Sequence, residues 1–175
     1  MSGSDALATF IEAATAVTDG VCAAQSVGSA TDLTINGSLS SGGEVTFDQP
    51  RNVTILSAGN DSGITFTVTG TDETATAVTE VITGASTGTA TGTTYFATIT
   101  QIASSGAAAG NVSVGSGTSI AAPIFRGSMR LIGLYVVNTG VAGTVTFRQT
   151  SATGTIGMQF NTVAAANTNA YPDIP

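Results

Sequence analysis

The sequence contains no histidine and no tryptophan, its only four cations are arginines, and Cys22 is its single cysteine. Without histidine, a Ser–His or Cys–His nucleophile is excluded, and most general bases are missing as well. A single cysteine cannot form an internal disulfide, so packing and strand pairing must hold the fold together. We therefore expect a protein that is not an enzyme, with no catalytic residues and no cofactor.

Charged residues are also scarce, at 9% of the chain, and the net charge is −7. Neutralising phosphates requires clustered basic residues, so this composition argues against nucleic-acid binding. No apolar run approaches the roughly 20 residues that span a bilayer, which argues against a membrane protein. The first residues, Met1–Asp5, lack a positively charged region. We therefore expect no signal peptide and synthesis in a reducing cytosol.

The clearest pattern that is present lies in residues 51–84. Two runs alternate apolar side chains with polar ones, and their apolar members are Val53 and Ile55, then Ile64, Phe66 and Val68. A period of two predicts β-strands with one buried face. Turn-forming residues at 58–63 and 70–74 separate these runs from a third, β-branched run at 75–83. We predict three strands joined by two tight turns.

Similar short runs recur on both sides of this stretch, at intervals near ten residues and with polar turns between them. This arrangement is typical of an antiparallel β-sandwich or jelly roll. The predicted fold is therefore all-β, with a β-sandwich domain over residues 31–118. Residues 85–92 are too polar to be buried and too rich in glycine for a helix, so they are interpreted as a loop or an edge strand.

A C-terminal β unit is predicted over residues 119–175, either sharing the core or completing a neighbour's sheet. The continuous apolar run at 131–137 predicts a strand buried on both faces. Val145 with Phe147, and then Ile156, Met158 and Phe160, predict two alternating strands. In the tail, the prolines at 172 and 175 disfavour continued central-strand pairing.

The N-terminal residues 1–30 are predicted to form an arm, helical or extended. Helical spacing relates five apolar residues: Leu7, Phe10, Ile11, Ala14 and Val17. Ser4 is a suitable N-cap for such a helix. The small residues that follow, up to Ala30, leave two possibilities open: the arm packs on its own β domain, or it orders only against a partner.

Residues 95–102 carry apolar side chains on both faces of the strand that they predict. Under regular alternation, Tyr95, Ala97 and Ile99 face one way, whereas Phe96 and Ile102 face the other. A strand covered on both sides needs a layer on each side, and a small chain obtains such cover most readily from other subunits. We therefore expect this chain to associate symmetrically with copies of itself.

Acidic residues offer the only candidates for a conventional site. A carboxylate pair for glycoside cleavage would have to come from Asp61, Asp72, Glu73 and Glu80. The turns at 60–62 and 72–73 could also hold calcium if they lay at the same end of the sandwich, but they lack the spaced carboxylates of a dedicated loop. The preferred interpretation assigns no metal: Asp61 and Asp72 shape turns, Glu80 is solvated on a strand, and Cys22 is a buried apolar side chain.

Three segments together resemble a type of small virion protein of tailed phages: RNVTILSAGNDSGITFTVTGTD at 51–72, TEVITG at 79–84 and YFATITQI at 95–102. Thr18–Cys22 and Leu33–Gly37 are similar to its N-terminal half, so the resemblance spans roughly residues 13–117. It implies a virion structural role, and within that role a capsid decoration (cement) protein. Such proteins are typically compact β-sandwiches, often trimeric, on the outside of the head, so the resemblance implies a homotrimer.

The expected partner is then the major capsid protein of a tailed phage, and the expected location is the capsid surface after synthesis in the host bacterial cytoplasm. Candidate contact residues are Leu7, Phe10, Ile11, Phe125, Arg126 and Arg130, the two arginines pairing either with an acidic partner or with this chain's own carboxylates. Residues 130–148 resemble other small phage head or tail modules. A tail or head–tail component, and an adhesive sugar-binding Ig-like module, are the alternatives.

Overall fold

The computed structural model describes residues 15–122, 134–137, 142–148, 155–163 and 167–170, the second and last of these by their backbone alone. The chain divides into two compact units, a larger one over residues 1–122 and a smaller one over residues 123–175. The described residues contain strands and no helix, so the prediction of an all-β fold is confirmed. The predicted boundary after residue 118 falls inside the last strand of the larger unit, which ends at Ile120.

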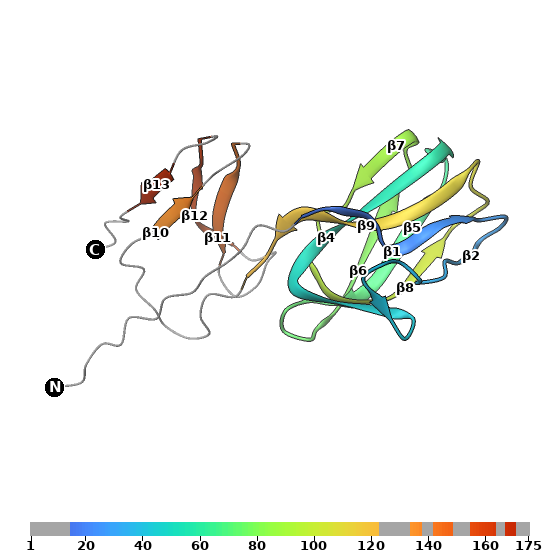
Figure 1. Ribbon diagram of the computed structural model, residues 1–175, viewed down its shortest axis with the longest axis horizontal. Coiled ribbons are helices and arrows are strands. Elements are labelled where there is room, and N and C mark those ends of the chain that lie inside the picture. The colour runs from blue at the N-terminus through green and yellow to red at the C-terminus, as the bar shows by residue number, and fades with distance from the viewer. Residues whose placement is uncertain (1–14, 123–133, 138–141, 149–154, 164–166, 171–175) are drawn as a thin grey trace. The chain divides into compact units, whose positions relative to one another are not determined.

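The larger unit is one antiparallel sheet of nine strands that folds onto itself (Figure 1). Six strands follow the order β1-β9-β4-β8-β5-β6, while β2 pairs with β8, and both β3 and β7 pair with β4. The strands are β1 (Val17–Ser26), β2 (Thr31–Asp32), β3 (Ser40–Ser41), β4 (Glu44–Asn60), β5 (Thr65–Thr71), β6 (Ala77–Thr83), β7 (Ser86–Thr91), β8 (Phe96–Ser104) and β9 (Asn111–Ile120).

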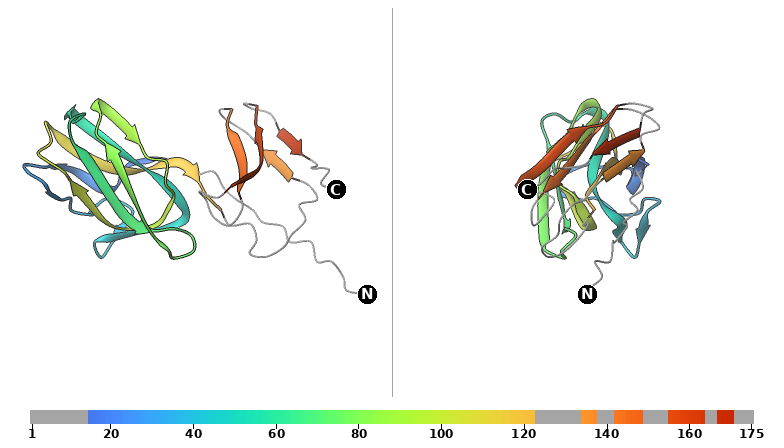
Figure 2. Two further views of the ribbon diagram at one scale, coloured as in Figure 1. Left: turned by 180° about the vertical axis from the view of Figure 1, so that it is seen from behind. Right: turned by 90° about the vertical axis from the view of Figure 1, so that its left-hand side faces the viewer.

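The long strand β4 belongs to both layers of this sandwich (Figures 1 and 2). Its first half pairs with β8, whereas its second half lies between β9 and β7. The registers with β8 and β9 both shift near Arg51, directly after Pro50. Proline interrupts regular pairing and is tolerated at such a bend. The break predicted at Pro50 is therefore the place where one continuous strand passes from one layer to the other.

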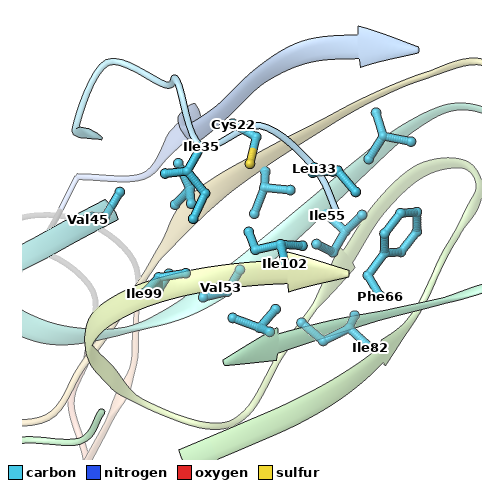
Figure 3. Packing of buried hydrophobic residues seen from close by; sticks show 14 of the residues in the cluster. Cys22, Leu33, Ile35, Val45, Val53, Ile55, Phe66, Ile82, Ile99 and Ile102 are labelled. Carbon is cyan, nitrogen blue, oxygen red and sulfur yellow. The ribbon is translucent and has the colours of Figure 1, made fainter. Parts of the chain in front are cut away.

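A single apolar cluster fills the space between the layers (Figure 3). It includes most of the residues whose alternation predicted strands, and Cys22 lies among them, fully buried. The buried members are Val21, Cys22, Val27, Leu33, Ile35, Val45, Phe47, Val53, Ile55, Phe66, Val68, Ile82, Phe96, Ile99, Ile102, Val112 and Val114. The period of two along β4 and β5 thus identified the core-facing side correctly.

Strand β8 does not follow regular alternation, which corrects one prediction. Phe96, Ile99 and Ile102 are all fully buried in the core of their own chain, although they are spaced by three. Gly70 pairs with Ile99 and Thr69 with Gln101, so Thr100 has no partner on β5 and forms a bulge. The prediction that placed Ile99 on the opposite face from Phe96 and Ile102 is therefore wrong, because all three face the core. Strand β8 thus gives no support to a homotrimer, which stays a prediction.

The first thirty residues are not an arm as a whole. Residues 17–26 form β1, which pairs with β9 and buries Val21 and Cys22 completely. Val17, placed at helical spacing by the sequence, begins this strand. The sequence did not predict this strand because few of its side chains are large and apolar, so it shows no clear period of two. Its pairing with β9 defines it instead. Leu7, Phe10, Ile11 and Ala14 lie outside the described residues.

The smaller unit contains two described strand pairs. β11 (Thr144–Arg148) pairs with β12 (Ile156–Asn161), and the rings of Phe147 and Phe160 stack with their centres 6.3 Å apart. β10 (Leu134–Val137) pairs with β13 (Asn167–Ala170). Strands were predicted in the first three of these segments, whereas β13 lies in the tail, just before Pro172.

Candidate functional site

The acidic residues that could have formed a catalytic or calcium site do not converge. Asp61 lies between β4 and β5, whereas Asp72 and Glu73 lie between β5 and β6. The seven residues of β5 separate these two turns, a length of roughly 20 Å. A glycosidase pair requires a separation below about 10 Å. A shared calcium site would require the two turns to lie at the same end of the sandwich, but they lie at opposite ends of β5. No group of three or more potential metal ligands occurs among the described residues.

Asp61 ties two turns together instead. Its side chain is almost completely buried, and its Oδ1 accepts a hydrogen bond of 2.7 Å from the backbone N–H of Ala109. Its own N–H donates to the carbonyl of Ala85. In the described structure, the second carboxylate oxygen, Oδ2, is buried without a hydrogen-bond partner. The prediction that Asp61 has a turn-shaping role holds, and the tie extends to a segment 48 residues away.

Asp72 shapes the β5–β6 turn, as the sequence predicted. Its Oδ1 accepts hydrogen bonds from the N–H groups of Thr74 and Thr76, at 2.8 and 3.0 Å, and from the Thr74 hydroxyl at 2.7 Å. These bonds enclose Ala75, which has a positive φ of 61°. A non-glycine residue in that region is uncommon and needs such local support.

Glu80 is not solvated on its strand, which corrects a second prediction. Its Oε1 accepts a hydrogen bond of 2.6 Å from the Thr93 N–H and one of 3.1 Å from the Thr93 hydroxyl. Its Oε2 accepts from the Thr94 N–H at 3.3 Å. The carboxylate thus holds the β7–β8 connection against β6, a structural role that sequence spacing could not reveal because the partners are 13 and 14 residues away.

Cys22 and Arg51 also have structural roles: Cys22 is buried in the core, and Arg51 forms an ion pair within the chain. Burial raises the pKa of the Cys22 thiol to about 12, which makes it unreactive at neutral pH. Arg51 Nη2 pairs with Asp48 at 2.8 Å, and the guanidinium lies 5.7 Å from the centre of the Phe47 ring. Burial would raise the pKa of Asp48, but hydrogen bonds from Arg51 and from the Gln49 N–H hold it below its ordinary value of 3.8.

The outer surface of the β8–β5–β6 layer offers a different kind of site. Alternate residues of β5 and β6 point away from the core and form facing rows without a charge: Thr65, Thr67, Thr69 and Thr71 on β5, and Ala77, Thr79, Val81 and Thr83 on β6. We call these rows the threonine face. Its polar groups are hydroxyls, so a partner would meet it through hydrogen bonds and methyl contacts.

The outer surface of the other layer has one shallow depression of about 370 Å³. Small or uncharged residues line it: Ala24, Leu56, Ser57, Ala58, Thr87, Gly88, Asn111 and Ser113. It therefore contains no acid, base or charged ligand. The predicted contact residues Leu7, Phe10, Ile11, Phe125, Arg126 and Arg130 all lie outside the described residues.

Comparisons with protein-family models, with curated proteins and with solved structures found no match to this chain. Within the described residues, no helix is long and apolar enough to cross a membrane.

Proposed function

We propose that this chain is a non-enzymatic structural protein of a tailed-phage virion, and specifically a capsid decoration protein that stabilises the shell from outside. The resemblance of residues 51–72, 79–84 and 95–102 to small virion proteins supports this role. The observation that carries the proposal is the use of the acidic side chains: Asp61, Asp72 and Glu80 each hold backbone segments in place. The threonine face of the larger unit offers a partner a surface without charged side chains.

The threonine face is the proposed docking surface for the major capsid protein. Facing rows of side chains on β5 and β6 keep a constant register over seven residue pairs, so the face is regular as well as uncharged. Contacts of this kind are weakly screened by salt, because no charge pair is involved. Binding to a shell should therefore persist at high ionic strength.

Co-sedimentation with shells that lack the protein tests this proposal. Saturable binding, a raised melting temperature of the shell, and similar binding in 0.1 and roughly 1 M salt are expected. Thr67→Lys, which places a charge in the middle of the face, should abolish binding. Ser38→Lys, on an exposed loop, is the matched control and should bind normally. Binding to tails instead of heads would favour a tail component, and glycan binding without either would favour an adhesive module.

A trimeric stoichiometry is not part of the proposal. Phe96 and Ile99, which were expected to face opposite sides of their strand and so to need a further layer or a neighbouring subunit, are both fully buried by their own chain.

A further inference from the structure

Three of the longer strands of the larger unit lie at sheet edges: β1, β6 and β7 each pair with one strand alone. An edge strand presents unpaired N–H and C=O groups, which can pair with another chain. Soluble proteins block such edges with bulges, prolines, charges or covering segments. The three edges differ in whether they have such protection.

The edge of β1 is covered. Residues 34–39 run along it, with backbone hydrogen bonds from Gly37 to Val21 and from Leu39 to Gly20, at 2.9 and 2.8 Å. The side chain of Asn36 accepts from the Ala23 N–H at 3.0 Å, in place of a backbone carbonyl. This segment occupies the positions that a neighbouring strand would take.

The edge of β7 is distorted. Thr87 and Gly88 have positive φ angles of 58° and 146°, and the register with β4 shifts between Ser57 and Asn60. A β-branched residue at positive φ is a conformational outlier. A strand bent in this way does not offer a straight row of hydrogen-bonding groups to a partner.

The edge of β6 has neither protection. All seven of its residues pair with β5 without a register shift, and the strand contains no proline and no lysine. In the described part of the chain, no backbone hydrogen bond reaches its outer edge. Val81, on this strand, is 62% exposed, the highest value among the exposed large apolar residues described in the larger unit. An open backbone edge and an exposed apolar side chain thus coincide.

We propose that β6 pairs with β6 of a second copy, antiparallel about a two-fold axis at Val81. This register places Val81 opposite its own counterpart, Thr79 opposite the partner's Thr83, and Glu80 opposite the partner's Ile82. Apolar and Thr–Thr cross-strand pairs stabilise antiparallel strands, and the register avoids placing the two Glu80 carboxylates directly opposite each other. The strand is therefore complementary to itself, as a two-fold interface requires.

At the β6 edge, charge does not oppose pairing with a second copy. The chain has a net charge of −7, so most contacts between copies would be repulsive. At the β6 edge, the one charged side chain is Glu80, and its carboxylate is held by Thr93 and Thr94 of its own chain. Two acidic chains can meet there without apposed free charges. The pairing is independent of the proposed virion role, because it requires no shell.

Light scattering of the full-length chain over a range of concentrations tests the pairing. A reversible dimer is expected, and Val81→Lys should weaken it at least tenfold, because lysine at an edge prevents strand addition. Thr67→Lys, on the same face but on the inner strand β5, is the matched control and should leave the dimer intact. A trimer, a monomer, or a dimer that Val81→Lys does not affect would overturn the proposal.

Cross-linking provides a second measurement, which does not depend on whether the Val81→Lys variant folds. Val81→Cys should form an intermolecular disulfide under mild oxidation, since directly opposite residues lie within the reach of such a bond. Thr67→Cys should not, because two β5 strands in the joined sheet would be three strand spacings apart, roughly 14 Å. Equal cross-linking of both variants would indicate random collision and contradict the proposed register. If the unsubstituted chain forms the dimer but does not bind shells, that result counts against the virion role alone.

Discussion

Gly70→Ala tests the close approach of β5 to β8 beside the bulge at Thr100. Gly70 is a buried residue of β5 and pairs with Ile99, next to the bulge at Thr100. A β-carbon at this position would collide with the carbonyl oxygen of Thr98, and it would lie 2.9 Å from the Thr98 carbonyl carbon and 3.1 Å from the Ile99 Cα. All three are backbone atoms, so no side-chain rotation relieves the contact. The two strands must separate locally.

The expected cost follows from two opposing effects. Overpacking of a close-packed interior costs about 1–3 kcal/mol, and a backbone collision belongs at the upper end of that range. Replacing glycine by alanine restricts the unfolded chain and returns about 0.4–1 kcal/mol. The net loss of unfolding free energy is therefore about 2 kcal/mol. For a unit of this size, such a loss lowers the melting temperature by roughly 10 °C.

Scanning calorimetry of the full chain measures this effect in the transition of the larger unit. The matched control is Gly63→Ala: a β-carbon there meets no atom within 4 Å, and we expect a change within about 0.5 kcal/mol. If Gly70→Ala unfolds at the same temperature as Gly63→Ala, the backbones of β5 and β8 do not approach each other at Gly70 as closely as the structure shows.

Three further predictions concern the side chains of Cys22, Asp61 and Glu80, which have structural roles in the larger unit. In the folded state, burial raises the pKa of the Cys22 thiol to about 12, whereas the pKa of an ordinary thiol is 9.0. Stability should therefore fall from pH 9 towards 12 by up to about 1.4 kcal/mol per pH unit relative to Cys22→Ala, measured by urea unfolding. Asp61→Ala should lose about 1–3 kcal/mol because the Ala109 N–H loses its charged acceptor, whereas Asp61→Asn keeps an acceptor and should lose less. Glu80→Ala should accelerate amide hydrogen exchange at Thr93, and unchanged exchange would contradict the clamp.

Much of the fold could be predicted from local patterns. The alternation of Val53 with Ile55, and of Phe66 with Val68, identified strands and their buried faces, because side chains alternate across a pleated strand whatever its neighbours are. The turns at 58–63 and 70–74 contain residues that form reversals locally, and the fold has turns there. The polar stretch at 85–92 contains the edge strand β7, one of the two interpretations offered for it.

Other features depended on distant partners. β1 has little periodicity of its own, and β9 on one side and residues 34–39 on the other define it. The bulge at Thr100 brings Ile99 and Ile102 to the same face, and the register with β4 shifts between Thr98 and Phe96, so regular alternation from Tyr95 assigned side chains to the wrong face. The candidate site was the feature least predictable from the sequence. Asp61 and Asp72, which are close in sequence, lie at opposite ends of β5, and the predicted contact residues lie outside the described part of the chain.

The sequence by itself determined the absence of histidine chemistry, the reliance on packing without an internal disulfide, and the all-β class, since these follow from residue types and from a period of two. Only the tertiary structure decided how β4 passes between layers, which carboxylates are fixed by backbone groups, and which edge is left bare. Those features arise from contacts between residues far apart in the chain. Asp61 meets Ala109, and residues 34–39 cover β1 but not β6, because of where the folded strands lie rather than because of any local pattern.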